Sequence, residues 1–161
     1  MNYINIKILR ATDLLNSNIN IIVIDGNFVL LPFQFKIDYL NEIRIKLEGN
    51  VKFIVFRQVL DELEAKRKRE LKSTKFPRLL DSGLLYLEKN KVNYDILFLD
   101  DIKEKSETTD AFLLKKSLKL KNEGYLIFLA TNDSELRRKA RLSKINTIFL
   151  RQKKYVSIER V

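Results

Sequence analysis

The sequence predicts an α/β protein, a three-layer α/β/α sandwich around a central, mostly parallel five-stranded sheet. Short β-rich runs alternate five times with segments of helical periodicity. The first run, residues 21–24, lacks polar alternation, as expected of a parallel strand buried on both faces. No internal repeat or interdomain linker is evident in the 161 residues. We therefore expect one domain over residues 19–161, preceded by a short N-terminal extension, residues 1–18.

Two strands and a helix between them are predicted first. Residues 21–24 are all β-branched, and the run ends abruptly at Asp25. Apolar residues then recur at helical spacing over 37–47 until Gly49, a common helix terminator. Residues 52–56 are the next β-rich run and predict the second strand.

Two helices are predicted between the second and third strands. Residues 58–72 have helical periodicity, and Pro77 opens a further helix because its fixed φ suits a first helical turn. The third strand is predicted over residues 94–99, where the apolar run is again short. A polar, acidic loop follows over residues 100–107.

The last third of the chain repeats the alternation of helix and strand. A helix is predicted from about Asp110 to Gly124, with Thr108 or Thr109 as its N-cap. Its predicted inward stripe consists of Ala111, Leu114 and Leu118. A further helix, with Leu136 and Ala140 inward, separates the last two strands. Those strands are predicted over 125–130 and 147–150, with 155–158 as an extension of the second.

The composition excludes several kinds of catalytic site. The chain has no cysteine and no histidine. Disulfides, thiolate nucleophiles, histidine-dependent triads and imidazole-bound zinc are therefore absent. Any chemistry must use carboxylates, hydroxyls, lysines or a metal-bound water.

The charge of the chain predicts a polyanionic partner. The net charge is +10 and the pI is about 9.7, which favours nucleic acid or an anionic surface. An alternative is compositional bias, because Lys, Ile and Asn are abundant throughout the chain.

The N-terminal residues have no long apolar core, so we expect neither a signal peptide nor a membrane anchor, and the cytoplasm is the expected location.

Four acidic residues are expected at one edge of the sheet. Asp25 and Asp133 each follow a predicted strand, whereas Glu62 and Asp110 lie near the starts of helices on the same side. Right-handed crossovers bring the carboxyl ends of parallel strands to a common edge, where ligands of α/β proteins bind. We therefore expect these four carboxylates to converge.

Converging carboxylates need a counter-charge. Two unit charges about 4 Å apart repel by about 4 kcal/mol at an effective dielectric of about 20. Oxygen ligands without His or Cys favour Mg²⁺ or Mn²⁺ over zinc. Such an ion activates water and stabilises charge on a phosphate without help from histidine.

Each acid also has a purely structural interpretation. Asp25 suits a turn in the sequence Asp-Gly-Asn, and Asp110 and Asp133 suit helix caps. Glu62 is harder to explain in this way, because helical spacing places it on an apolar face with Val59 and Leu63. The shared edge favours the functional interpretation for all four.

Basic residues near the predicted acids are candidates for RNA binding. The first group follows Glu62 and contains Lys66, Arg67, Lys68, Arg69, Lys72 and Lys75, with Phe76 available to stack on a base. The second group is Arg137 and Arg138. Alternatively, these residues form solvated helix ends, where cations interact favourably with the helix dipole.

These motifs together resemble a PIN-domain ribonuclease over residues 21–158. The similar stretches are Asp25-Gly26-Asn27, the helix start 59–63, Asp110-Ala111, and Thr131-Asn132-Asp133. Residues 30–35 and 149–152 most resemble archaeal members related to Fcf-type endonucleases, which cleave pre-ribosomal RNA. VapC-type toxins of toxin–antitoxin pairs share the catalytic pattern. The resemblance implies metal-dependent endonucleolytic cleavage of single-stranded RNA.

The resemblance also implies roles for individual residues. The four acids of the family match Asp25, Glu62, Asp110 and Asp133, which would hold the metal ion. The polar residues that hold the first and last acids match Asn27 and Asn132, and Thr131 matches the hydroxyl residue that orients the site.

Two departures from the family pattern leave catalytic activity open. Gly26 replaces the usual Ser or Thr, and Thr109 replaces the first of two adjacent aspartates. The alternatives are a VapC-type toxin, a catalytically silent RNA-binding protein, and a haloacid-dehalogenase-like phosphatase with Asp25 as its nucleophile. The resemblance is compatible with a homodimer and with an antitoxin or a ribosome-assembly factor as partner.

Overall fold

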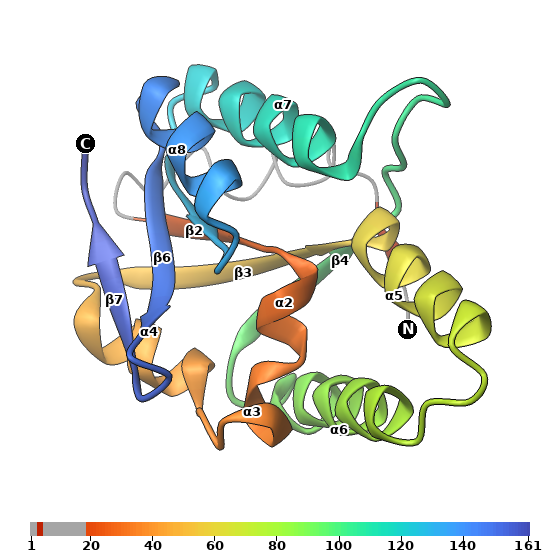
Figure 1. Cartoon of the computed structure of the whole chain (residues 1–161). Helices are drawn as coiled ribbons and strands as arrows, with labels where there is room; N and C mark the ends of the chain where they lie inside the picture. Colours follow the sequence, from red (N-terminus) through yellow and green to blue (C-terminus); the bar gives the residue numbers. More distant parts are fainter. Residues whose placement is uncertain (1–2, 5–18) are drawn as a thin grey trace.

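The sheet of the computed structural model has seven strands in the order β1-β4-β3-β2-β5-β6-β7 (Figure 1). The structure describes residues 3–4 and 19–161. Five strands were predicted from the sequence: β2 (Ile19–Ile24), β3 (Asn50–Phe56), β4 (Asp95–Leu99), β5 (Leu126–Ala130) and β6 (Asn146–Arg151). All pairings among these five are parallel. The predicted α/β sandwich with a mostly parallel sheet is confirmed.

The two additional strands lie at the edges of the sheet. β1 (Tyr3–Ile4) pairs in parallel with β4, and the remainder of the predicted N-terminal extension lies outside the described residues. β7 (Tyr155–Glu159) pairs antiparallel with β6. Residues 155–158 are thus extended as predicted, but they form a separate antiparallel strand and not an extension of β6, because the chain reverses at Gln152 and Lys153, whose φ angles are 54° and 56°.

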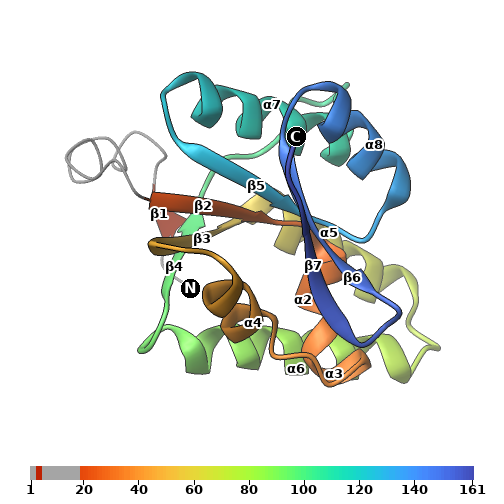
Figure 2. The same ribbon diagram turned by 90° about the vertical axis from the view of Figure 1, so that its left-hand side faces the viewer.

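Helices cover both faces of the sheet. α7 (Thr109–Asn122) and α8 (Ser134–Leu142) lie on one face, and α4 (Tyr39–Lys46) and α6 (Lys75–Asn90) lie on the other (Figure 2). α5 (Arg57–Arg69) follows β3 directly. These five helices correspond to those that the sequence predicts. No helix in the described part of the chain is long and apolar enough to span a membrane.

Two very short helices follow β2 and were not predicted. They are α2 (Gly26–Val29) and α3 (Leu31–Gln34). α2 packs closely on α6 at Gly83, where a Cβ atom would lie only 2.0 Å from the carbonyl oxygen of Val29. Only glycine permits this approach, which fixes α2 beside the carboxyl end of β2.

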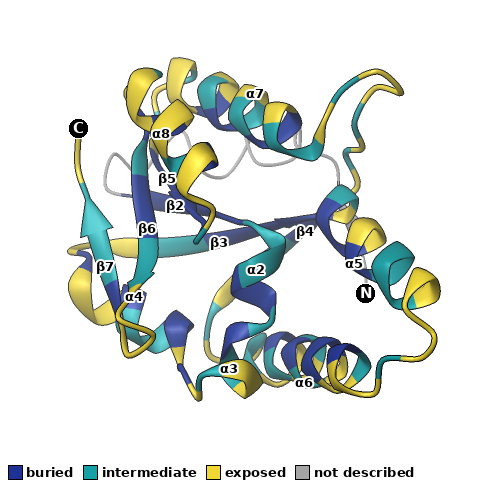
Figure 3. Cartoon of the chain, viewed as in Figure 1, coloured by how far each residue is buried: buried dark blue, intermediate teal, exposed yellow. Residues whose placement is uncertain are grey.

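The core lies between the sheet and the helices, with β2 buried along its whole length (Figure 3). The predicted inward stripe of α7 is right only in part. Leu114 and Leu118 are partly buried and pack against the core, but the fully buried apolar residues of α7 are Phe112, Leu113 and Leu120. Phe112 packs edge-to-face on Phe56 at 5.2 Å between ring centroids. Ala111 is exposed. α7 is apolar on more than one side, so its periodicity does not identify the face that contacts the sheet.

Candidate active site

Asp25 lies where β2 ends and α2 begins, as the N-cap of α2. Its carboxylate accepts three hydrogen bonds. Oδ1 accepts from the backbone N–H of Gly26 at 2.7 Å, and Oδ2 accepts from Asn27 Nδ2 at 3.0 Å and from the hydroxyl of Thr131 at 2.7 Å. Charge-assisted bonds of this kind fix the orientation of a carboxylate.

Thr131 and Asn132 connect Asp25 to the neighbouring strands. The fully buried Thr131 hydroxyl also accepts a hydrogen bond from the backbone N–H of Asp133 at 3.1 Å. The backbone N–H of Asn132 donates to Asn27 Oδ1 at 2.9 Å, and Asn132 Oδ1 accepts from the backbone N–H of Leu150 at 2.7 Å. The Asn132 side chain thus fastens β6 to the site.

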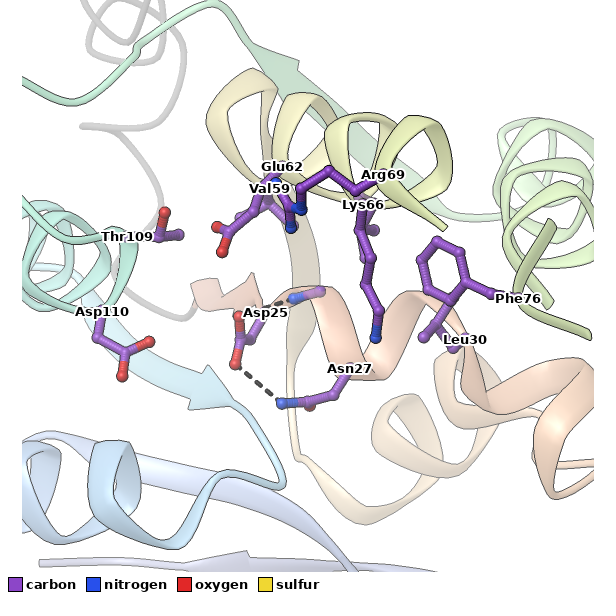
Figure 4. A pocket seen from close by; sticks show the side chains of 12 residues that line it. Asp25, Asn27, Leu30, Val59, Glu62, Lys66, Arg69, Phe76, Thr109 and Asp110 are labelled. Atoms are coloured by element: carbon purple, nitrogen blue, oxygen red, sulfur yellow. Dashed lines mark hydrogen bonds between the residues drawn. The ribbon is translucent and has the colours of Figure 1, made fainter. Parts of the chain in front are cut away.

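Three of the four predicted acids line one pocket at the carboxyl edge of the sheet (Figure 4). Asp25 is contributed by the end of β2, Glu62 by α5 and Asp110 by the first turn of α7. The pocket also contains Lys66, Arg69 and Phe76. Its volume of about 230 Å³ accommodates several water molecules.

The carboxylates interact electrostatically. Burial raises the pKa of Asp25, the hydrogen bonds from Thr131 and Gly26 oppose this rise, and the charges of Asp110 and Glu62 increase it. The pKa of Asp110 is also raised, first by burial and then by the charge of Asp133. A site that disfavours its own negative charge in this way is suited to a cation.

Asp133 does not line this pocket and is exposed. It caps α8, with Oδ1 accepting a hydrogen bond from the backbone N–H of Leu136 at 2.8 Å. Within the described chain Oδ2 has no hydrogen-bond partner, and the charge of Asp133 acts on Asp110. Asp133 therefore combines a structural role with a position beside the acidic group.

The donor set suits a hard divalent cation that keeps part of its hydration shell. Among the described residues, no three acidic side chains lie close enough together to ligate one ion directly. Mg²⁺ is commonly bound through only one or two carboxylates and several waters. Asp25 has the most firmly oriented carboxylate of the group, and Glu62 and Asp110 line the same pocket.

Only part of the first basic group faces the pocket. Lys66 and Arg69, three residues apart on α5, line it, and neither forms an ion pair within residues 19–161. Arg67 is turned away and binds Asp81 at 2.6 Å. The remaining members of this group are exposed and do not line the pocket: Lys68, Lys72 and Lys75.

The second basic group also divides. Arg137 stacks on Phe149, with its Cζ atom 4.1 Å from the ring centroid. Arg138 is exposed and forms a two-point salt bridge with Glu135 at 2.6 and 3.0 Å. Arg137 and Arg138 therefore have different environments despite being neighbours.

Two expectations about the burial of neighbouring side chains are wrong. Glu62 shares the pocket-facing side of α5 with Val59 and Leu63, as predicted, but it is exposed rather than buried, because the pocket between α2, α5 and α7 is open to solvent. Phe76 is 6% exposed, and Lys66 Nζ lies 4.6 Å from its ring centroid. Its ring is part of the pocket wall and does not project as a stacking platform.

One residue near the acids was missed by the sequence analysis. The charge of Lys139, on α8, lowers the pKa of Asp110 against the effect of burial. Lys139 belongs to the last turn of α8, where a lysine is ordinarily explained by the helix dipole. Nothing in the sequence distinguished it from its basic neighbours.

The chain is similar in sequence to known proteins. The family model described as PIN domain matches residues 22–151. The chain is 30% identical over 138 residues to Ribonuclease VapC4 of Methanocaldococcus jannaschii, covering 85% of this chain and 95% of that protein.

Two solved structures have a similar fold. The PIN domain endonuclease Utp24 has a TM-score of 0.58 and 21% identity, covering 91% of this chain and 96% of that one. A domain of a functionally unknown protein from M. jannaschii has a TM-score of 0.59 and 17% identity, covering 81% and 91% of the two chains. The sequence match over most of its length shows that this chain belongs to the PIN-domain family.

Proposed function

We propose that this protein is an endoribonuclease that cleaves single-stranded RNA with Mg²⁺ or Mn²⁺ bound at the carboxylate pocket. The observation that carries the proposal is the environment of Asp25. Three donors orient its carboxylate, while burial and the charges of Asp110 and Glu62 raise its pKa. The similarity to a protein named as a ribonuclease supports RNA as the substrate.

The residues of the pocket have different roles in the proposed phosphodiester hydrolysis. Asp25 would be the principal ligand of the cation, and Glu62 and Asp110 would complete the negative site. The cation, when bound, supplies an activated water and stabilises charge on the phosphate. Thr131 and Asn27 hold the Asp25 carboxylate in one orientation. Asp133 is the fourth acid of the predicted site. Its Oδ2 atom accepts no hydrogen bond within the described chain, and its negative charge acts on Asp110.

Lys66 and Arg69 are suited to hold the RNA backbone. Both line the pocket that contains Asp25, and neither is neutralised by an acid within the described chain. A phosphate adjacent to the reacting one would find both cations within the same pocket. Arg67, in contrast, is already paired with Asp81.

The departure at Gly26 is compatible with activity. Its backbone N–H still donates to Asp25 at 2.7 Å, so the contact that orients the carboxylate does not need a side chain. A Cβ at this position would meet Leu63 Cδ2 at 3.4 Å, which is ordinary contact. Thr109 lines the pocket where relatives often have a second acid, so this site carries one negative charge fewer.

The protein partner would distinguish a toxin from a housekeeping enzyme. A VapC-type toxin would pair with an antitoxin, whereas an RNA-processing role would involve a ribosome-assembly factor. We propose RNA as the substrate in either case. Purification of the natural complex, with its mass measured by light scattering, would identify the partner and test for a homodimer.

The test is cleavage of end-labelled single-stranded RNA with added Mn²⁺ or Mg²⁺. Asp25→Asn should abolish cleavage. Asp95→Asn is the matched control, because Asp95 is a half-exposed acid at the opposite end of the sheet, paired with Lys52 at 3.5 Å. Chelation of the cation should abolish cleavage by the wild type. Undiminished cleavage by Asp25→Asn would refute the assignment, and RNA binding without any cleavage would favour a silent RNA-binding protein.

A further inference from the structure

A second group of cations and aromatic rings lies on the side of α2 opposite to α5. We call it the stacking surface, and it consists of Arg137, Phe149, Arg151, Lys153 and Phe35. Two guanidinium groups lie near the Phe149 ring, with the Cζ atoms of Arg137 and Arg151 at 4.1 and 5.4 Å from its centroid. Lys153 Nζ lies 5.8 Å from the centroid of Phe35. Figure 1 shows β6 and α5 on either side of α2.

The cations of the stacking surface are not neutralised by the protein. Within residues 19–161, no salt bridge with an acid is formed by Arg137, Arg151 or Lys153. Arg138, beside Arg137 in sequence, is paired with Glu135. The Nε atom of Arg137 is buried and has no hydrogen-bond partner in the described part of the chain, so the side chain is held by its contact with the ring of Phe149.

The stacking surface is joined directly to the carboxylate site. Asn132 accepts a hydrogen bond from the backbone of Leu150 at 2.7 Å and donates its own N–H to Asn27 at 2.9 Å. Phe149 is therefore the chain neighbour of Leu150, the β6 residue whose backbone N–H binds Asn132. Side chains two apart on a strand share a face, which places Phe149 and Arg151 together.

We infer that the stacking surface binds single-stranded RNA on one side of the cleaved phosphate, while Lys66 and Arg69 bind the strand on the other side. The inference rests on the proposed function and specifies the path of the substrate. Guanidinium planes and a half-buried ring provide stacking faces for bases, and unpaired cations attract the backbone. An acidic peptide would use the charges but would not need the ring.

A path on both sides of the site has a consequence for the reaction. The strand must continue past Asp25 in both directions, so cleavage is internal. An RNA that ends at the cleaved phosphate would lose one of the two contacts. It should therefore be a poorer substrate than one that extends on both sides.

Tryptophan fluorescence tests the stacking directly, because the chain contains no tryptophan. Phe149→Trp, placed in the inactive Asp25→Asn protein, provides one reporter on the surface. Addition of an oligoadenylate of about 12 nucleotides, within the range of single-strand binding sites, should quench its emission saturably. The control is Leu126→Trp in the same background, because Leu126 is 46% exposed at the opposite end of the sheet. Its emission should not change.

Kinetics of otherwise intact enzyme provide the second test. Phe149→Leu and Arg151→Ala should each raise KM about five-fold, the fold-change at the lower end of base–aromatic stacking, with kcat largely kept. Arg151 is exposed, so its removal does not disturb the core. Arg141→Ala is the matched control, since that exposed cation on the same helix as Arg137 is paired with Glu159 at 3.6 Å, and it should leave KM unchanged.

The outcomes separate this inference from the proposed function. Normal cleavage with unquenched Phe149→Trp and unchanged KM for Arg151→Ala would overturn the stacking surface and leave the nuclease assignment intact. Failure of the wild type to cleave or bind any single-stranded RNA would overturn both. Quenching by a synthetic acidic peptide equal to that by RNA would also overturn the inference, because it would show a protein-binding surface.

Discussion

Replacement of Thr131 by valine tests the hydrogen-bond network that orients Asp25. Valine has nearly the same shape but lacks the hydroxyl, which is fully buried, donates to Asp25 Oδ2 at 2.7 Å and accepts from the backbone N–H of Asp133 at 3.1 Å. A hydrogen bond to a charged group contributes about 1.5–3 kcal/mol, and a buried N–H left without a partner costs about 1–3 kcal/mol.

The two effects are partly offset by the more apolar side chain of valine. We therefore expect Thr131→Val to lower the free energy of unfolding by about 2–4 kcal/mol. For a chain of this size each kcal/mol shifts Tm by about 2–4 °C, so Tm should fall by about 5–15 °C. Loss of the donor should also raise the pKa of Asp25 further, which moves the acidic limb of the pH profile of cleavage to higher pH.

Differential scanning calorimetry and a pH series of cleavage rates measure these effects. Ser117→Ala is the matched control, because the Ser117 hydroxyl is equally buried but has no hydrogen-bond partner among the residues that the structure describes. Its removal from α7 should leave Tm unchanged or raise it slightly. A Thr131→Val protein as stable as the wild type, with an unshifted pH profile, would refute the role of this network.

Two further predictions concern charge. Burial and the charge of Asp133 raise the pKa of Asp110. The stability that Asp110 contributes is thus present below the ordinary pKa of an aspartate and lost as pH rises through the raised value. In metal-free protein, the gain in Tm from Asp110→Asn should therefore grow between about pH 4 and pH 7, and a gain independent of pH would contradict the raised pKa. Secondly, Lys66→Ala should raise KM for RNA several-fold and weaken the salt dependence of binding, whereas Lys68→Ala, outside the pocket, should do neither. Equal effects of the two variants would show that only overall charge matters.

The fold was largely predictable from the sequence, because its buried strands are short runs of β-branched and aromatic residues. β2 to β6 and the five longer helices follow from such runs and from helical spacing. The short helices α2 and α3 contain four residues each, too few to show a period. The face of α7 was assigned only in part, because Leu114 and Leu118 have the same spacing as the fully buried residues.

The acidic residues that follow from strand order and strand ends could be predicted from the sequence. Asp25 follows β2 and Asp110 lies in the first turn of α7, so the topology alone brings both to the carboxyl edge. Exposure was not predictable, because the burial of Glu62 depends on how far α5 stands from α7. The sequence also did not predict which basic residues face the pocket, since Lys66 and Arg67 are neighbours in sequence but only Lys66 faces it.

Titration calorimetry with Mn²⁺ near neutral pH tests most directly whether the carboxylate pocket is a cation site. The wild type should take up the ion saturably, and Asp25→Asn should lose this uptake while remaining folded. Asp95→Asn, altered at the far end of the sheet, should bind as the wild type does. No saturable uptake by the wild type, or equal uptake by Asp25→Asn, would contradict a metal-dependent site at Asp25.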